Sequence, residues 1–238
     1  MSVQDDGKII RDPELCKKCG KCVTACNFNA MRMFGKYSTA DDVIHEVLKD
    51  RVFYEQSGGG VTLSGGEPLL QHDFSLYILK QLNHEGIHTA IETCGYCQWE
   101  DFLPILNHTD LVLFDLKHLD FELHKNYTGV NNDLILNNLK NILQMEKKIV
   151  VRFPLIPGFN DDTKNIDAMV AFLKNNRLSH LHIMPFHQMG QEKWYSLKKN
   201  YACETVIPPS EETITKIVKQ MRSAGIIVNV GGDGNYPD

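Results

Sequence analysis

The sequence predicts an α/β protein, namely a partial (β/α) barrel of parallel strands that follows a small cysteine-rich lobe. Two observations predict this fold. Short apolar segments rich in β-branched residues alternate with amphipathic segments along most of the chain, and this alternation is typical of a parallel sheet. Ahead of it, four of the seven cysteines lie between residues 16 and 26. We therefore expect two domains, a lobe at residues 1–34 and the barrel at residues 35–238.

Each predicted element follows from its local pattern. A short strand is expected at residues 7–10, and a helix is expected at residues 39–52, with Ser38 or Thr39 as its cap. Strands are expected at residues 61–63, 88–92, 111–116, 149–155, 181–184 and 226–230. Helices are expected at residues 74–83, 99–106, 134–145, 163–174 and 211–222, with Gly86 and Gly225 just beyond two of them. Six such units suggest a barrel or part of one, and the polar stretch 189–209 is expected to be a lid or surface loop.

The composition argues against several classes of function. Hydrophobic residues make up 42% of the 238 residues, which is enough for a substantial core. The net charge of −5 and the pI of about 6.1 argue against a nucleic-acid-binding surface. No apolar run approaches the roughly 20 residues of a membrane span, and residues 1–6 lack the features of a signal peptide. We therefore expect a cytoplasmic protein without membrane or nucleic-acid partners, in which seven reduced cysteines indicate metal or redox chemistry.

The cysteine run has the spacing of an iron–sulfur site. It reads C-x2-C-x2-C-x3-C and consists of Cys16, Cys19, Cys22 and Cys26. Bacterial ferredoxins hold [4Fe–4S] clusters with this spacing, whereas zinc, the alternative, is usually held by two C-x-x-C pairs set well apart. In two-cluster ferredoxins the fourth cysteine binds the other cluster and a proline follows it. Here Asn27 follows and no second run occurs, so the spacing leaves open whether Cys26 closes its own cluster.

A glycine turn follows the first barrel strand. Residues 57–71 read SGGGVTLSGGEPLLQ, a short β-rich core followed by Gly65, Gly66 and Glu67 and then an amphipathic run. Glycines after a strand let a ligand touch the backbone, because no Cβ stands in the way. The turn is therefore a candidate ligand site, and the alternative is a tight loop that binds nothing.

Several segments in a fixed order together resemble one family. They are the cysteine run, SGGGVTLSGGEPLLQ, IETCGY, LFDLKH, VRFPLIPGFND and MPFH. The chain resembles the glycyl-radical-enzyme activating enzymes, which are radical S-adenosylmethionine (SAM) proteins related to pyruvate formate-lyase activase. The resemblance extends from about residue 7 to residue 231. It implies a partial barrel of radical SAM type with a ferredoxin-like [4Fe–4S] lobe.

The resemblance implies a SAM site at the carboxyl ends of the strands. Gly65, Gly66 and Glu67 would hold the amino group of SAM, since exposed carbonyls and a carboxylate suit an ammonium group. The other implied cofactor-binding residues are Glu92, Asp115, Leu116, Lys117, Arg152 and His187. No side chain is assigned a catalytic role.

These residues have individual implied roles. Lys117 would pair with the SAM carboxylate, and Asp115 would contact the ribose or a bound cation, with Glu92 close to it. Arg152 and His187 would face the SAM pocket. Ordinary ion pairs at strand ends and a structural histidine are the alternatives. The cysteines at positions 94 and 97 are expected to be plain thiols, and residues 160–162 are expected to cap the next helix.

The resemblance also implies a reaction. In a complete relative, one electron from a site cluster cleaves SAM to methionine and a 5′-deoxyadenosyl radical, which takes a hydrogen atom from a glycine of the partner. The implied partners are this glycyl radical enzyme and an electron donor such as flavodoxin or ferredoxin. The cluster at residues 16–26 would be an auxiliary centre.

One family motif does not occur in the sequence. Members of the family hold the site cluster with C-x3-C-x2-C, and no such spacing is present here. We therefore expect an N-terminally truncated activating enzyme that is inactive alone. The alternative is a non-catalytic iron–sulfur module for electron transfer or binding.

Overall fold

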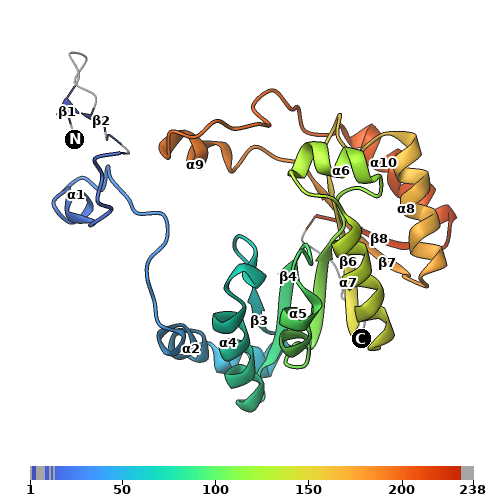
Figure 1. The fold of residues 1–238 in the computed structure, drawn as a ribbon, viewed down its shortest axis with the longest axis horizontal. Helices are drawn as coiled ribbons and strands as arrows, with labels where there is room; N and C mark the ends of the chain where they lie inside the picture. Colours follow the sequence, from blue (N-terminus) through green and yellow to red (C-terminus); the bar gives the residue numbers. More distant parts are fainter. Residues whose placement is uncertain (1, 4–8, 11, 13, 232–238) are drawn as a thin grey trace. The chain divides into compact units, whose positions relative to one another are not determined.

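The structure is a computed structural model that describes residues 2–3, 9–10, 12 and 14–231. The chain divides into two compact units, Met1–Thr39 and Ala40–Asp238 (Figure 1). Each unit is described separately below.

The described residues of the first unit hold little regular structure. Strand β1 (Ser2–Val3) pairs antiparallel with β2 (Ile9–Ile10), and helix α1 (Lys21–Thr24) carries one of the clustered cysteines. The predicted strand at residues 7–10 is present in its last two residues, while residues 7 and 8 lie outside the described residues.

The second unit is built on a parallel sheet of six strands in the order β3-β4-β5-β6-β7-β8. The strands are β3 (Gly60–Leu63), β4 (His88–Thr93), β5 (Leu111–Asp115), β6 (Lys148–Leu155), β7 (His180–Pro185) and β8 (Ile227–Val230). Their bounds differ from the predicted ones by at most one residue. Within the described residues, β3 and β8 form the two edges and the sheet does not close. The predicted partial (β/α) barrel is confirmed.

Five helices of this unit confirm predicted helices, with bounds that differ by at most two residues. They are α4 (His72–His84), α5 (Trp99–Leu106), α7 (Asp133–Gln144), α8 (Thr163–Asn175) and α10 (Glu211–Ser223). Asp162 caps α8 as expected, because its carboxylate accepts a hydrogen bond from Asn165 N. Gly86 and Gly225 follow α4 and α10 with φ angles of 70° and 84°, the left-handed conformation in which glycine commonly ends a helix.

The prediction of one helix at residues 39–52 is wrong. The segment forms α2 (Ala40–Leu48) and α3 (Arg51–Ser57). The amides of Lys49 and Asp50 bond to carbonyls three residues back, which tightens the last turn of α2, and Tyr54 Oη donates to Val47 O. These contacts satisfy the end of one helix while Asp50 begins the next.

Three short helices of the second unit were not predicted, and α1 in the first unit was not predicted either. The three are η1 (Pro68–Gln71), α6 (Phe121–Thr128) and α9 (Gln191–Ser196). The stretch 189–209, predicted to be a lid or surface loop, contains α9, and the rest of it is turns and irregular backbone.

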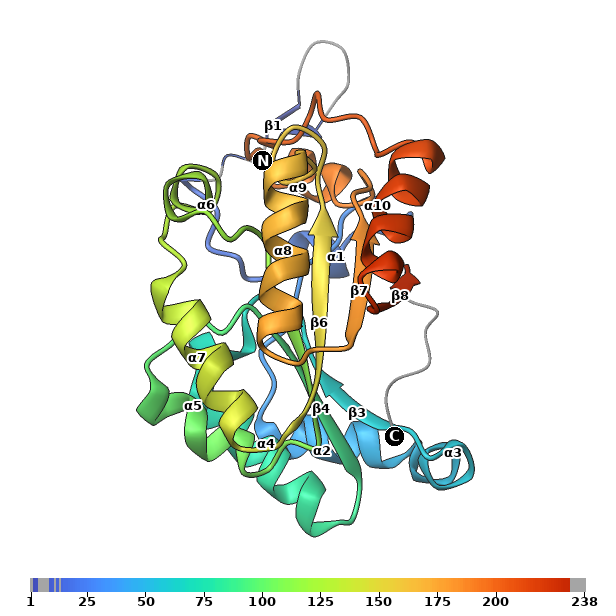
Figure 2. The ribbon, with the colours of Figure 1, turned by 90° about the vertical axis from the view of Figure 1, so that its right-hand side faces the viewer.

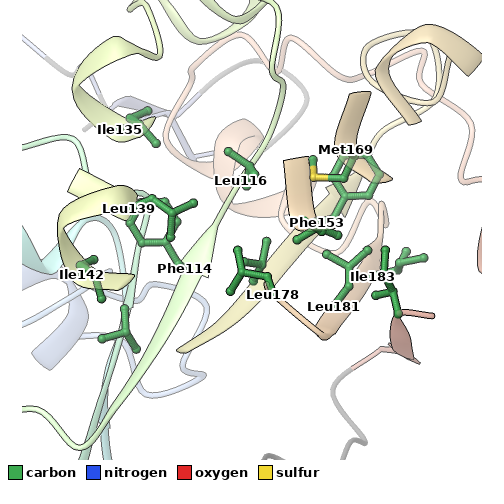
Figure 3. Packing of buried hydrophobic residues seen from close by; sticks show 14 of the residues in the cluster. Phe114, Leu116, Ile135, Leu139, Ile142, Phe153, Met169, Leu178, Leu181 and Ile183 are labelled. Carbon is green, nitrogen blue, oxygen red and sulfur yellow. The ribbon is translucent and has the colours of Figure 1, made fainter. Parts of the chain in front are cut away.

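The core lies between the sheet and its helices. Strands β4–β8 pack their buried apolar side chains against α4, α5, α7, α8 and α10 on one face (Figure 2). Phe114 and Phe153 point from β5 and β6 toward Leu139 of α7 and Met169 of α8 (Figure 3). The other face carries a small apolar cluster formed by Ala90, Leu111, Leu113 and Val150. Since both faces are covered in the middle, β5 reads as a continuous apolar run.

The described part of the chain contains no helix that is long and apolar enough to cross a membrane.

Candidate functional site

The glycine turn lies at the carboxyl end of β3. Gly65 has a φ of 121°, a conformation that favours glycine, so this position requires glycine for the backbone itself. Gly66 has no such φ, and an added Cβ there would meet no atom within 4 Å. The fold therefore gives no reason for glycine at position 66, whereas the close approach of a ligand would.

The carboxylate of Glu67 is tied to the end of the neighbouring strand. Its Oε1 accepts from Thr93 Oγ1 at 2.7 Å and from Leu69 N at 3.2 Å, and its Oε2 accepts from Cys94 N at 2.9 Å. These bonds join the turn to β4. Glu67 is thus held in place by the protein before any ligand binds.

The guanidinium of Arg152 on β6 bridges a carboxylate on β4 and a carboxylate on β5. Arg152 Nε lies 2.9 Å from Asp115 Oδ1, and Arg152 Nη1 forms an ion pair with Glu92 Oε1. Ser64 Oγ donates to the other oxygen of Glu92. Lys117 Nζ lies 3.6 Å from Asp115 Oδ2. The predicted proximity of Glu92 to Asp115 is therefore present, with the arginine between them.

Polar side chains also occur at the register positions next to Arg152 on β7 and β8. In the sheet register Arg152 faces His182 of β7, and His182 faces Asn229 of β8. His182 is buried, its Nε2 lies 3.0 Å from Asn229 Nδ2, and burial followed by the charge of Arg152 lowers its pKa. Neither residue was predicted. The alternation of the strand, which puts His182 on the face of Arg152, is the signal that could have indicated it.

Two predicted residues are placed differently from the rest. The side chain of Leu116 is 1% exposed and packs in the core beside α7 (Figure 3), so only its backbone can contribute to a site. His187 lies beyond the end of β7 with its side chain exposed. The carboxyl ends of parallel strands nevertheless place five predicted residues at one edge of the sheet. Asp115 is the last residue of β5, and the other four, Gly65, Glu67, Lys117 and His187, lie just beyond the ends of strands.

Cys94 and Cys97 follow β4 and are free thiols. Burial raises the pKa of Cys94 to about 11, and the hydrogen bond and negative charge of Glu67 add to this effect. Burial raises the pKa of Cys97 to about 12, again with a contribution from Glu67. The thiolate is the reactive form of cysteine, so these groups are chemically quiet at neutral pH.

Backbone N–H groups donate hydrogen bonds to two sulfurs of the cysteine run in the first unit, an arrangement that suits thiolates. Cys16 Sγ accepts from Lys18 N at 3.4 Å, and Cys26 Sγ accepts from Ala30 N at 3.3 Å. Backbone N–H groups, that of Phe28 first and then that of Ala30, lower the pKa of Cys26. Gly20 curls the loop with a φ of 74°. Among the described residues, no three His, Cys, Asp or Glu side chains are grouped so that they could hold a metal ion, so the fit to a cluster rests on spacing and on these N–H···S bonds.

Comparison with known proteins identifies related sequences. The profile of the radical SAM superfamily matches residues 20–170. The chain is 37% identical over 235 residues to the 4-hydroxyphenylacetate decarboxylase activating enzyme of Clostridioides difficile strain CD196, which covers 97% of this chain and 74% of that enzyme. It is 37% identical to the trans-4-hydroxy-L-proline dehydratase activating enzyme of Clostridioides difficile, covering 94% and 85%. It is 42% identical to the isethionate sulfite-lyase activating enzyme of Oleidesulfovibrio alaskensis, covering 82% and 64%.

Solved structures share the fold. A domain of pyruvate-formate lyase-activating enzyme from Bacteroides vulgatus superposes with a TM-score of 0.61 at 31% identity, covering 73% of this chain and 99% of that domain. Streptococcus suis SuiB bound to S-adenosylmethionine superposes with a TM-score of 0.60 at 18% identity, covering 84% and 45%. The second likeness concerns the fold alone.

Proposed function

Because the chain belongs to the radical SAM superfamily, among the glycyl-radical-enzyme activating enzymes, we propose that it serves to form a glycyl radical on a partner enzyme. Enzymes of this superfamily use a [4Fe–4S] cluster and SAM, which when bound supply the radical chemistry by reductive cleavage of SAM. The observation that carries the proposal concerns Gly66. An added Cβ at this position would meet no atom within 4 Å, and the next residue, Glu67, is held by hydrogen bonds to the end of β4.

The proposed SAM site uses residues at the carboxyl edge of the sheet. The carbonyls of Gly65 and Gly66, with Glu67, would accept hydrogen bonds from the ammonium group of SAM. Lys117 would pair with its carboxylate, for which the long 3.6 Å contact with Asp115 leaves donor capacity. His187, exposed beyond β7, would reach the nucleoside from the far side of the site.

Arg152 would organise the site rather than bind SAM directly. Two of its donors are already engaged with Asp115 and Glu92. The bridge holds both carboxylates in fixed positions, from which Asp115 could contact the ribose or a cation. Leu116 would contribute only through its backbone.

The lobe at residues 16–26 is proposed to hold one [4Fe–4S] cluster through Cys16, Cys19, Cys22 and Cys26. The spacing and the N–H···S bonds of Cys16 and Cys26 support this ligand set. The cluster would be auxiliary, and an electron donor such as flavodoxin or ferredoxin would reduce the enzyme. Seven free thiols fit a reducing compartment, so we also propose a cytoplasmic location.

We further propose that the chain as written is inactive alone. No three of its cysteines have the C-x3-C-x2-C spacing that holds the site cluster in the family. The same observation favours a second candidate function, a non-catalytic iron–sulfur module for electron transfer or binding.

Anaerobic reconstitution with iron and sulfide tests these proposals. The reduced chain is expected to show the electron paramagnetic resonance signal of one [4Fe–4S] cluster, lost in Cys19→Ala and kept in the matched control Cys203→Ala. With SAM and reductant we expect no 5′-deoxyadenosine from this chain alone. Reductant-dependent formation of 5′-deoxyadenosine would contradict the inactivity, and a chain that binds no cluster would contradict the ligand set.

A further inference from the structure

Buried asparagines lie beneath the segment that carries Lys117. The described residues include four buried asparagines, and three of them contact residues 117–119. These are Asn132, Asn160 and Asn165, which are 2%, 0% and 3% exposed. A buried amide is costly unless its donors and its acceptor are used, so the partners of these side chains indicate what they hold in place.

Asn160 joins the ends of β5 and β6. Its Nδ2 donates to Lys117 O at 2.8 Å and to Pro154 O at 2.6 Å, and its Oδ1 accepts from Ile156 N at 2.8 Å. The amide thus uses both donors and its acceptor on backbone groups. Asparagine suits this task because it is neutral and carries both kinds of group on a short side chain.

The other two asparagines hold the next residues of the segment. Asn132 Nδ2 donates to His118 O at 3.1 Å and to Leu119 O at 2.9 Å. Asn165 Oδ1 accepts from Leu119 N at 3.3 Å, while its Nδ2 donates to Asn160 O at 2.9 Å. The carbonyls of three successive residues, Lys117 to Leu119, are therefore all bound by buried amides.

This arrangement fixes the direction in which Lys117 leaves the sheet. The amide of Leu116 continues the ladder to Arg152 O at 2.9 Å, and the carbonyl of Lys117 is fixed by Asn160. The lysine side chain itself has one ion-pair contact, at 3.6 Å, which is too long to orient it. The direction of its Cα–Cβ bond is therefore set by the backbone and, through the backbone, by Asn160.

We propose that Asn160 is a positioning residue that aims Lys117 at the carboxylate of SAM, with Asn132 and Asn165 bracing the following residues. The ligand in this inference rests on the proposed function, whereas the mechanical link between Asn160 and Lys117 does not. The two parts are therefore tested by separate measurements.

Hydrogen–deuterium exchange tests the mechanical link without a ligand. Asn160→Asp keeps the acceptor for Ile156 N but puts a carboxylate oxygen against the two carbonyls, and Asn160→Ala removes all three bonds. We expect the amides of Leu119 and Asp120 to exchange about tenfold faster in either variant. Asn176→Ala, which removes one bond to Phe172 O near the end of α8, is the matched control. Unchanged exchange in a folded Asn160 variant would overturn the proposal.

A double-mutant cycle with calorimetric titration of SAM tests the ligand. Lys117→Met and Asn160→Asp are each expected to weaken SAM binding by about tenfold or more, and the double variant should bind no more weakly than Lys117→Met. Additive losses would mean that Asn160 does not act through Lys117, which overturns the inference. If the unaltered chain binds no SAM, the proposed function fails, and the exchange measurement still decides whether Asn160 holds the segment.

Discussion

Arg152 Nε donates to Asp115 Oδ1 at 2.9 Å across the register pair that joins β6 to β5. The same guanidinium bonds Glu92 on β4, so one arginine holds carboxylates from two other strands. Lys117 adds a second cation beside Asp115. Two cations and two carboxylates therefore form one ion-paired group, and three of its members lie on three adjacent strands.

Removal of this bridge should destabilise the fold. Arg152→Met leaves Glu92 and Asp115 as neighbouring carboxylates without their shared partner, and we expect the free energy of unfolding to fall by about 1–3 kcal/mol. Urea denaturation at pH 7 measures this change. Arg177→Met, at an exposed arginine, is the control and should change stability little. Equal stability of the two variants would mean that the bridge contributes nothing.

Alanine at Gly65 should lower stability, whereas alanine at Gly66 should abolish SAM binding. Gly65→Ala places a side chain at a φ of 121° and should cost about 1–2 kcal/mol of stability. Gly66→Ala meets no atom within 4 Å, so its stability should stay within about 0.5 kcal/mol, while SAM binding should be lost. Thermal denaturation and calorimetric titration separate the effects. Gly190→Ala, at another open glycine, is the control, and normal SAM binding by Gly66→Ala would refute a ligand at this turn.

Thr93 should contribute more to stability and to SAM binding than Thr109, a threonine that is buried to the same extent. Thr93→Val removes a donor to Glu67 and the acceptor for Gly95 N, whereas Thr109→Val removes one bond to Ile105 O. The two residues are 2% and 1% exposed. We expect losses of about 2 and about 1 kcal/mol in urea denaturation, and weaker SAM binding only for Thr93→Val. Equal effects of the two variants on SAM binding would show that the tether of Glu67 is irrelevant to the ligand.

The thiols after β4 predict an alkaline dependence of stability. Folding raises the pKa of Cys94 to about 11 and that of Cys97 to about 12, from 9.0 in each case. As the pH rises from about 9 to 11, the unfolded chain loses protons that the folded chain retains, so the free energy of unfolding falls. The variant Cys94→Ala/Cys97→Ala should flatten this slope in denaturation at several pH values. An unchanged slope in the double variant would contradict the burial of these thiols.

Much of the fold could be predicted from local patterns. The strand β5 and the helix α5 have a continuous apolar run and a clear helical period, and both appear within one residue of their expected bounds. The break between α2 and α3 could not be predicted in this way. At the break, Tyr54 Oη of α3 donates to Val47 O of α2, a contact between helices that no local period encodes.

The candidate site was predictable where charged residues follow apolar strands. Asp115 and Lys117 are examples, because a charge at the end of a buried strand is conspicuous in the sequence. His182 and the asparagines beneath Lys117 were not found. His182 lies inside an apolar strand, and Asn160 reads as part of a helix cap until its partners on β5 and β6 are known. Such residues act through register and loop packing, which depend on the tertiary structure.

The central claim is that the carboxyl edge of the sheet, around Gly66 and Lys117, binds SAM. Nuclear magnetic resonance of the isotopically labelled chain during SAM titration tests it most directly. We predict saturable shifts of the amides at residues 64–67 and 115–117, with none at Thr215 or Lys219 on α10. Shifts centred on other elements, or no shifts at saturating SAM, would contradict the account.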